Sequence, residues 1–182
     1  MGSCDDMTDA PVNTEKEVIA PEAGTAEIYV LNEGLFNLNN STLMRYSFSN
    51  GTQTPDYFKK INKRGLGDTA NDMAIYGSKL YVVVNVSSQI EVIDLKTGTS
   101  LKQIGMLTEN GSSRQPRYIT FFENKAYVCS FDGTVARIDT TSLAIEALTQ
   151  VGRNPDGLCV QNNKLYVSNS GGLDNPNYDN TV

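Results

Sequence analysis

Short apolar runs broken by turn residues recur along the chain, and each run is long enough for one β-strand. Four of them share a charged residue, an apolar residue, tyrosine and valine: Glu27–Val30, Lys79–Val82, Lys125–Val128 and Lys164–Val167. Their tyrosines are 52, 46 and 39 residues apart. Repeats of roughly 40–50 residues, each with several short β-rich runs, are typical of propeller blades rather than of helical solenoids.

Two further patterns accompany these runs. Runs that end in aspartate, Ile90–Asp94 and Val135–Asp139, follow the middle two, and we expect each aspartate to cap the turn after it. A polar or proline-containing turn precedes the last three runs, and its sequence aligns Asn71 with Gln115 and Asn154. Several motifs therefore repeat in the same order.

The best-defined unit predicts a four-stranded blade. Its strands are expected at Arg117–Phe122, Lys125–Phe131, Thr134–Asp139 and Ala144–Val151, with hairpin turns such as Asp132-Gly133 between them. No segment keeps a 3.6-residue period, so we expect at most a turn or two of helix. The fold class predicted from the sequence is therefore all-β, a β-propeller.

The number of units bears on the length of the protein. Residues 24–182 hold about three and a half units, whereas a closed propeller has ~4–8 blades. We therefore expect the N-terminal half of a longer protein. Glu27–Asn32 corresponds to the second strand of its blade, so the innermost strand beside it is expected to come from another segment.

Composition narrows the function classes. The chain has 182 residues, a net charge of −6, no histidine and no tryptophan. Residues 1–22 carry six acids and one lysine, so residues 1–24 are predicted to be a disordered acidic tether and 25–182 the propeller domain. The lack of a basic stripe argues against nucleic-acid binding, and the lack of histidine excludes the usual catalytic triads and imidazole metal sites.

The three cysteines suggest two different roles. Cys129 and Cys159 lie in strand-like apolar runs and are expected to be small buried thiols. Cys4 follows small residues and precedes acidic ones, which resembles the processed end of a bacterial lipoprotein with the surface-export signal of Bacteroidetes. No apolar signal segment precedes it. The resemblance implies lipidation of Cys4 and attachment to the outer-membrane surface through the lipid alone, with the periplasm as the alternative location.

The repeated motifs, over about residues 26–182, resemble the YncE-like (YVTN) family of seven-bladed propellers. Leu31–Gly34, Leu66–Asp68 and Met73 are similar to a branch of Bacteroidetes surface lipoproteins. Some relatives in that branch bind cobalamin at the cell surface and pass it to an outer-membrane transporter. The resemblance implies a seven-bladed propeller and no cofactor, but loops vary within propeller folds and determine the ligand.

In the arrangement that this resemblance implies, one face collects the loops that enter the innermost strands and those that follow the Tyr-Val strands. The candidate ligand-binding residues there are Asn71, Asp72, Arg117, Tyr118, Asn154, Asp156, Phe36 and Asn85. Such a mixture of amide, charged and aromatic groups suits a polar ligand with some flat apolar surface. The same residues also suit a structural role, as turn caps or as an Arg–Asp tie between blades.

Three other motifs carry weaker signals. Gly65–Ala70 satisfies a dinucleotide-binding fingerprint, but it lacks the strand before and the helix after and is interpreted as a loop between blades. The basic run Lys59–Arg64 is expected at the solvated edge of an outermost strand, or at an anionic ligand. The oxygen-rich segment 174–179 is expected to be a connecting loop or a weak cation site.

Three functions follow from these patterns. The first, which the family resemblance implies, is a non-enzymatic cell-surface propeller that captures a small ligand, a corrinoid as the leading candidate or else a glycan, together with an outer-membrane transporter. The second is a structural or adhesive propeller of the envelope that docks other proteins. The third is a propeller enzyme, a hydrolase, lyase or dehydrogenase, whose catalytic groups lie in another part of the protein.

Overall fold

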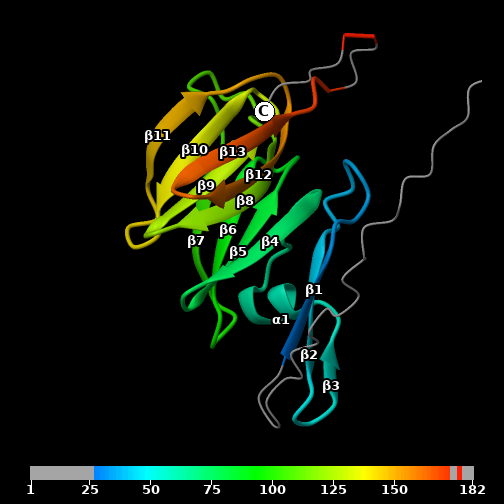
Figure 1. The fold of residues 1–182 in the computed structure, drawn as a ribbon. Helices are drawn as coiled ribbons and strands as arrows, with labels where there is room; N and C mark the ends of the chain where they lie inside the picture. Colours follow the sequence, from blue (N-terminus) through cyan, green and yellow to red (C-terminus); the bar gives the residue numbers. More distant parts are fainter. Residues whose placement is uncertain (1–26, 173–175, 178–182) are drawn as a thin grey trace, which may run out of the picture.

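The computed structural model describes residues 27–172 and 176–177, and almost all of its regular structure is β. The first sheet has the order β1-β2-β3 and is formed by Glu27–Asn32, Thr42–Ser47 and Thr52–Thr54. A short helix, α1 (Tyr57–Asn62), follows it and leads to the second sheet. Figure 1 shows the sheets following one another in chain order, from blue at β1 to orange at β13.

Two complete four-stranded antiparallel sheets follow. The second sheet has the order β4-β5-β6-β7 and comprises Ala70–Tyr76, Lys79–Val84, Gln89–Asp94 and Ser100–Gly105. The third sheet is built in the same way from β8 to β11: Pro116–Phe122, Lys125–Ser130, Thr134–Asp139 and Ile145–Gln150. These bounds agree with the strands predicted from sequence to within one residue. The prediction of an all-β fold made of propeller-like blades is confirmed.

The described chain ends in a partial fourth unit and begins with a partial first one. β12 (Pro155–Gln161) and β13 (Lys164–Asn169) pair as a two-stranded sheet. In the first sheet β1 pairs only with β2, and no other described strand lies on its second edge. β1 therefore matches a second strand, as its Tyr-Val motif predicts. The origin of the innermost strand beside it stays a prediction.

Side chains on the two faces of each blade belong to different cores. In β5, Leu80, Val82 and Val84 pack with Leu43 and Phe58 between the first and second sheets. The alternate residues Tyr81 and Val83 pack with Val128 between the second and third sheets. Both faces of β5 are thus buried, which explains its unbroken apolar run. Successive sheets are held together by these apolar layers.

Helix α1 corrects one prediction. The basic run lies on this helix and just after it, not at the edge of an outermost strand. The Asp56 carboxylate accepts a hydrogen bond from the Lys59 N–H and begins the helix, and Lys63, in the left-handed conformation, ends it. The buried side chains of Tyr57 and Phe58 anchor it. Six residues are too few to show a helical period in the sequence.

The two predicted turn caps are confirmed. Asp94 Oδ1 accepts from the Thr97 N–H at 2.8 Å, and Asp139 Oδ1 accepts from the Ser142 N–H at 2.7 Å. The Thr97 hydroxyl, which also donates to Asp94, and the Thr97 N–H lower the pKa of Asp94. The Lys125 ammonium and the Ser142 N–H lower the pKa of Asp139. The aspartates at the ends of β6 and β10 therefore fix the hairpins that follow.

The two described cysteines differ in solvent exposure. Cys129 is buried as predicted, but the prediction for Cys159 is wrong, because its side chain is exposed. Cys159 lies opposite Tyr166 in the two-stranded sheet, and no described strand covers that side. Cys4 lies outside the described residues. No helix in residues 27–172 is long and apolar enough to cross a membrane.

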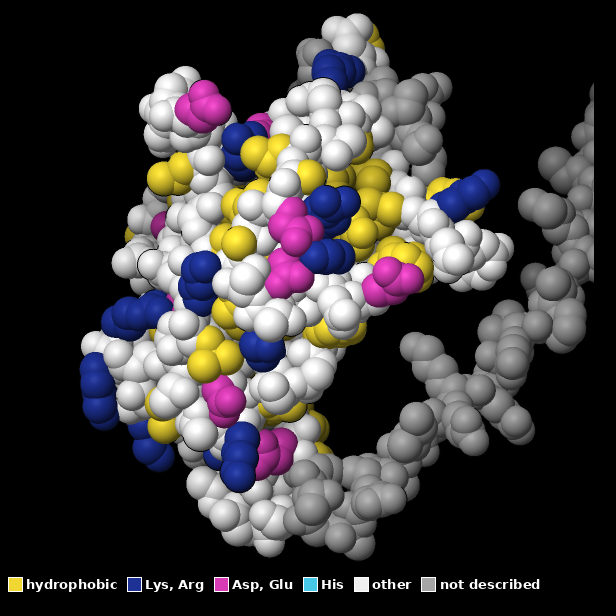
Figure 2. All heavy atoms as spheres, turned by 90° about the vertical axis from the view of Figure 1, so that its left-hand side faces the viewer, with side chains coloured by type: hydrophobic (Ala, Val, Ile, Leu, Met, Phe, Trp, Pro, Cys, Tyr) yellow, Lys and Arg dark blue, Asp and Glu magenta, His cyan; other side chains and the backbone are white. Residues whose placement is uncertain are grey.

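On the face drawn in Figure 2, acidic and basic side chains lie next to one another in small groups, and apolar side chains gather in the upper half. Among the ion pairs of the described residues, the Lys125 ammonium joins Asp139 and Glu146, and Glu146 also pairs with Arg137. Charge on the outer strands of the third blade is therefore compensated locally.

Candidate functional site

The innermost strands of three consecutive blades carry a bulge at the same place. In the pairing of β4 with β5, Met73 lies opposite Val82, and the register shifts between Ala70 and Asp72. Ile119 lies opposite Val128 after an equivalent shift. A bulged strand gains an extra residue and turns its side chain aside. The extra residue is Asn71 in β4 and Arg117 in β8. In β12 the shift lies between Pro155 and Leu158, and Asp156 follows the first proline of its strand as Arg117 does.

This register corrects the sequence alignment in the first of these blades. Asn71 matches Arg117 and Asp156 rather than Gln115 and Asn154, because the true equivalent of these last two is Thr69, two residues earlier. The turn before β4 was aligned by its composition. An error of two residues is hard to detect in this way, because side chains two positions apart lie on the same face of a strand.

Thr69, Gln115 and Asn154 share an unusual backbone. Their φ angles are 58°, 55° and 49°, in the left-handed region that residues other than glycine rarely adopt. Each carbonyl accepts a hydrogen bond from the N–H of the residue after the Tyr-Val strand, at 2.8, 3.0 and 3.1 Å: Asn85, Phe131 and Ser170. The loop that leads into each blade therefore has one repeated main-chain design.

The bulged residues link each blade to the next. The Asn71 side-chain amide donates to the Arg117 carbonyl at 2.5 Å. The Arg117 Nε donates to Asp156 Oδ1 at 2.8 Å. The Arg117 guanidinium also lies 4.7 Å from the centre of the Phe131 ring and 5.6 Å from that of Tyr118. Three equivalent positions thus form a chain of contacts across three blades.

Two more predicted residues bind the same strand, β8. Asp72 Oδ2 accepts from the Ile119 N–H at 2.9 Å, and its Oδ1 accepts from the Met73 N–H. Burial raises the pKa of Asp72, although these two hydrogen bonds act in the opposite direction. The Asn85 amide donates to the Pro116 carbonyl at 2.9 Å. These contacts are ties between blades, the structural role that the sequence analysis set beside ligand binding.

A groove opens beside two of these residues. Its volume is about 470 Å³, and it lies between the second edge of β1 and the beginning of β4, lined by Tyr29, Val30, Leu31, Glu33, Ala70, Asn71, Asp72 and Met73. The buried Oδ1 of Asn71 has no hydrogen-bond partner among the described residues. An apolar floor with a few polar groups is typical of small-molecule sites.

The loop between β1 and β2, which begins beside the groove residue Glu33, presents exposed apolar side chains. Leu35, Phe36 and Leu38 are 65%, 70% and 58% exposed. Their backbone is nevertheless fixed, because the buried Asp68 carboxylate accepts from the N–H groups of Asn37 and Asn39 at 3.2 and 3.1 Å. The sequence analysis found Phe36 but missed its two apolar neighbours and Asp68.

The loop and the strand beginnings lie at the same end of the blades. The Ser41 N–H donates to the Gly67 carbonyl, and the Ser41 hydroxyl accepts from the Ala70 N–H at the start of β4. Asn154 borders the loop that leads into β12, and its carbonyl also accepts from the Ser170 hydroxyl. The structure therefore brings together Asn71, Asp72, Asn85, Arg117, Tyr118 and Asp156, with Phe36 and Asn154 at the rim.

The segment 65–70 is a loop between blades, as the sequence analysis interpreted it, because α1 precedes it and β4 follows it. Within residues 27–172 no three histidine, cysteine or acidic side chains come together as a metal site. Most of the oxygen-rich segment 174–179 lies outside the described residues.

Successive four-stranded sheets, joined at their innermost strands by repeated bulges, define a β-propeller-like protein. The chain belongs to the family described as a domain of unknown function, DUF5074, whose sequence profile matches residues 26–175. No curated protein sequence matches the chain.

Solved structures share the fold at low identity. A protein of unknown function from Bacteroides caccae is 17% identical with a TM-score of 0.54, over 74% of this chain and 50% of that one. The computationally designed proteins Ika8 and Ika4 are 15% and 12% identical, both with a TM-score of 0.57 over 78% of this chain. The match covers 40% of Ika8 and 79% of Ika4. The chain thus spans half or less of the Ika8 and Bacteroides caccae chains.

Proposed function

We propose that this protein is a non-enzymatic, YncE-like propeller of the cell surface that captures a small ligand at the face formed by the strand beginnings. The ligand class that fits best combines a flat apolar surface with polar edges. A corrinoid meets this description and is favoured by the resemblance to cobalamin-binding surface propellers; a glycan is the other candidate.

The observation that carries the proposal is the groove beside β1. It joins apolar side chains, Tyr29, Leu31 and Met73, with the Asp72 carboxylate and the unpartnered Asn71 carbonyl. A flat apolar ligand gains from the apolar floor, and a donor on its edge would satisfy Asn71. The fixed apolar loop with Phe36 extends the same surface, and its order in the free protein reduces the entropy lost on binding.

The experiment is calorimetry of the full chain with cyanocobalamin and with a panel of neutral glycans. Phe36→Ser should weaken binding of the true ligand about five- to tenfold, which corresponds to ~1–1.4 kcal/mol. Phe48→Ser is the matched control, because Phe48 is also exposed but lies after β2 at the far end of the hairpin. No heat with any probe, or equal losses in both variants, would contradict the assignment.

Attachment to the outer membrane through an acylated Cys4 belongs to the same proposal. The motif around Cys4 supports it. Expression of the natural gene with a radiolabelled fatty acid should label the protein and place it in the membrane fraction, and Cys4→Ala should abolish both. Co-purification of an outer-membrane transporter with the wild type would identify the partner.

A second function, docking of another protein, is favoured by a specific observation. The polar residues of the candidate site already bind neighbouring blades: Arg117, Asp156, Asn71 and Asp72. The loop of Leu35, Phe36 and Leu38 makes no such use of its side chains and leaves an exposed apolar surface. Loss of partner co-purification in the Phe36→Ser variant, with no small ligand bound by the wild type, would favour this function.

A further inference from the structure

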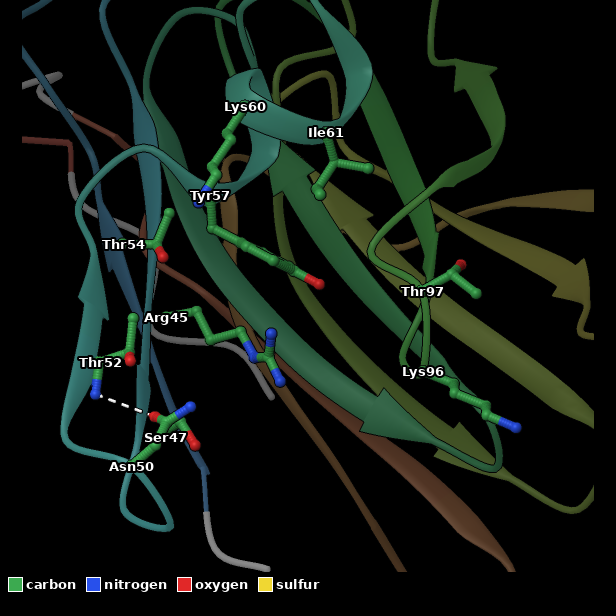
Figure 3. Close-up of a pocket in the computed structure, with 10 residues that line it drawn as sticks. All are labelled: Arg45, Ser47, Asn50, Thr52, Thr54, Tyr57, Lys60, Ile61, Lys96 and Thr97. Carbon is green, nitrogen blue, oxygen red and sulfur yellow. Dashed lines mark hydrogen bonds between the residues drawn. The ribbon is translucent and has the colours of Figure 1, made fainter.

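A second cleft lies between the first two blades, away from the groove beside β1. Its volume is about 320 Å³, and Figure 3 shows the ten residues that line it: Arg45, Ser47, Asn50, Thr52, Thr54, Tyr57, Lys60, Ile61, Lys96 and Thr97. They come from β2, β3 and the turn between them, from helix α1 and from the turn after β6. The size suits one sugar ring or a similar headgroup rather than a drug-sized ligand.

All the charged residues that line this cleft are basic. Three of the ten residues are cations and none is acidic, although the whole chain has a net charge of −6. Arg45 pairs with Glu27 through its Nε and Nη2, and its guanidinium also lies 5.1 Å from the centre of the Tyr57 ring, so its charge is largely compensated. Asp94 lies close enough to Lys96 for their charges to interact. Lys60 forms no ion pair with any described residue, so its charge remains available.

Hydroxyl groups make up most of the remaining lining. Five side chains carry one: Ser47, Thr52, Thr54, Tyr57 and Thr97. In Figure 3 the Tyr57 hydroxyl and the Arg45 guanidinium point into the same space, Lys60 reaches down from α1, and Lys96 extends outward at the rim. Hydroxyls both donate and accept hydrogen bonds and therefore match the hydroxyls of a sugar.

The walls of the cleft are held in place by contacts between the two blades. The Asn62 amide donates to the Gly98 carbonyl at 3.0 Å, and its Oδ1 accepts from the Ser100 N–H at 2.8 Å. Gly98 lies so close to Tyr57 that an added Cβ would be 2.3 Å from the phenol oxygen. Helix α1 and the β6–β7 turn are thus fixed at a set spacing before any ligand binds.

We propose that this cleft binds a sugar that carries a tetrahedral oxyanion, a sulfate or phosphate monoester. Lys60 binds the ester oxygens, with Lys96 at the rim, and Arg45, whose charge is shared with Glu27, lines the cleft beside them. Guanidinium and ammonium groups form charge-assisted hydrogen bonds with such oxyanions. The surrounding hydroxyls bind the ring. This site is separate from the groove beside β1, and it gives a function to the basic run that the sequence analysis singled out.

The test is binding of glucose 6-sulfate, glucose 6-phosphate, glucose and inorganic phosphate to the full chain, measured by calorimetry. One or both esters should bind at least fivefold more tightly than glucose and than phosphate, and the better ester identifies the group. Glucose or phosphate binding as tightly as both esters would overturn the proposal, and so would the absence of binding by either ester.

Matched variants locate the site. Lys60→Gln and Lys96→Gln should each weaken binding of the better ester, Lys60→Gln at least fivefold. Lys59→Gln removes the same charge from an exposed position of the same helix, but Lys59 does not line the cleft. The affinity of this variant for the ester should therefore stay within twofold of that of the wild type. Equal losses in the Lys59 and Lys60 variants would show diffuse attraction and overturn the site.

Discussion

Arg117 and Asp156 occupy the same bulge position in consecutive blades, and the Arg117 Nε donates to Asp156 Oδ1 at 2.8 Å. The bond joins two neighbouring innermost strands at their beginnings, and the stacking of the guanidinium on Phe131 supports it. The same bulge that turns these side chains out of the strand pairing thus lets one blade hold the next.

Arg117→Ala should therefore lower the free energy of unfolding by about 1 kcal/mol, because a partly exposed ion pair and a cation–π contact are both lost. Urea unfolding of the full chain measures this. Arg137→Ala removes a more exposed Arg–Glu pair and should change stability by less than about 0.5 kcal/mol. Equal effects in the two variants would contradict a special role for the bulge position.

A larger effect is expected at Glu91. Its side chain is fully buried, and both carboxylate oxygens accept from the Arg64 Nη2 at 2.8 and 2.9 Å, with a further bond from Ser100. Arg64→Met removes the cation beside this buried charge; because the Arg64 side chain is itself 40% exposed, it should lower the free energy of unfolding by about 2 kcal/mol.

The double variant Arg64→Met with Glu91→Leu removes the buried charge as well. It should regain most of the lost stability, since a buried ion pair contributes little compared with apolar residues of similar volume. Chemical denaturation of the wild type, the single variants Arg64→Met and Glu91→Leu, and the double variant measures the coupling. A double variant as unstable as Arg64→Met alone would contradict this account.

The half-buried Asp72 predicts a pH dependence of stability. Burial raises its pKa, so the folded state holds this proton more tightly than the unfolded state does. Its contribution to stability is present at low pH and is lost as the pH rises from the ordinary value of 3.8 through the raised value. Asp72→Asn does not titrate, so its stability relative to the wild type should increase with pH over that range. A difference that stays constant with pH would argue against this.

The two cysteines within the described blades should differ in reactivity. Burial raises the pKa of the Cys129 thiol to about 11, whereas Cys159 is exposed. The thiolate is the reactive form, so iodoacetamide at pH 8 should modify Cys159 in the folded protein and leave Cys129 intact. Peptide mass mapping distinguishes the two. Urea should make both reactive, which controls for the reagent.

The blades could be predicted from the sequence because each level of the pattern agreed. The Tyr-Val runs marked the second strands, and the turns after Asp94 and Asp139 marked the hairpins. The pairing of the buried Glu91 with Arg64 could not be predicted in this way. Glu91 alternates with apolar residues along β6, a pattern that places it equally well on a solvated face.

The sequence indicated which residues lie at the strand beginnings, but not which residues they contact. Arg117 and Asp156 do meet, yet their partners depend on a bulge whose extra residue is invisible to a count of spacing. Asp68 was missed as the residue that orders the loop of Phe36, because its two N–H partners lie about 30 residues earlier in the chain. The residues around Asp68 in the sequence give no sign of a contact with that earlier segment.

The left-handed residue that leads into each blade has a consequence for protein engineering. It is threonine, glutamine or asparagine in successive blades, and main-chain atoms alone form the hydrogen bond that closes each loop. Side chains at 69, 115 and 154 can therefore vary without disturbing that bond. Randomising these codons together would give a library of rims on one unchanged scaffold, from which new binding surfaces could be selected.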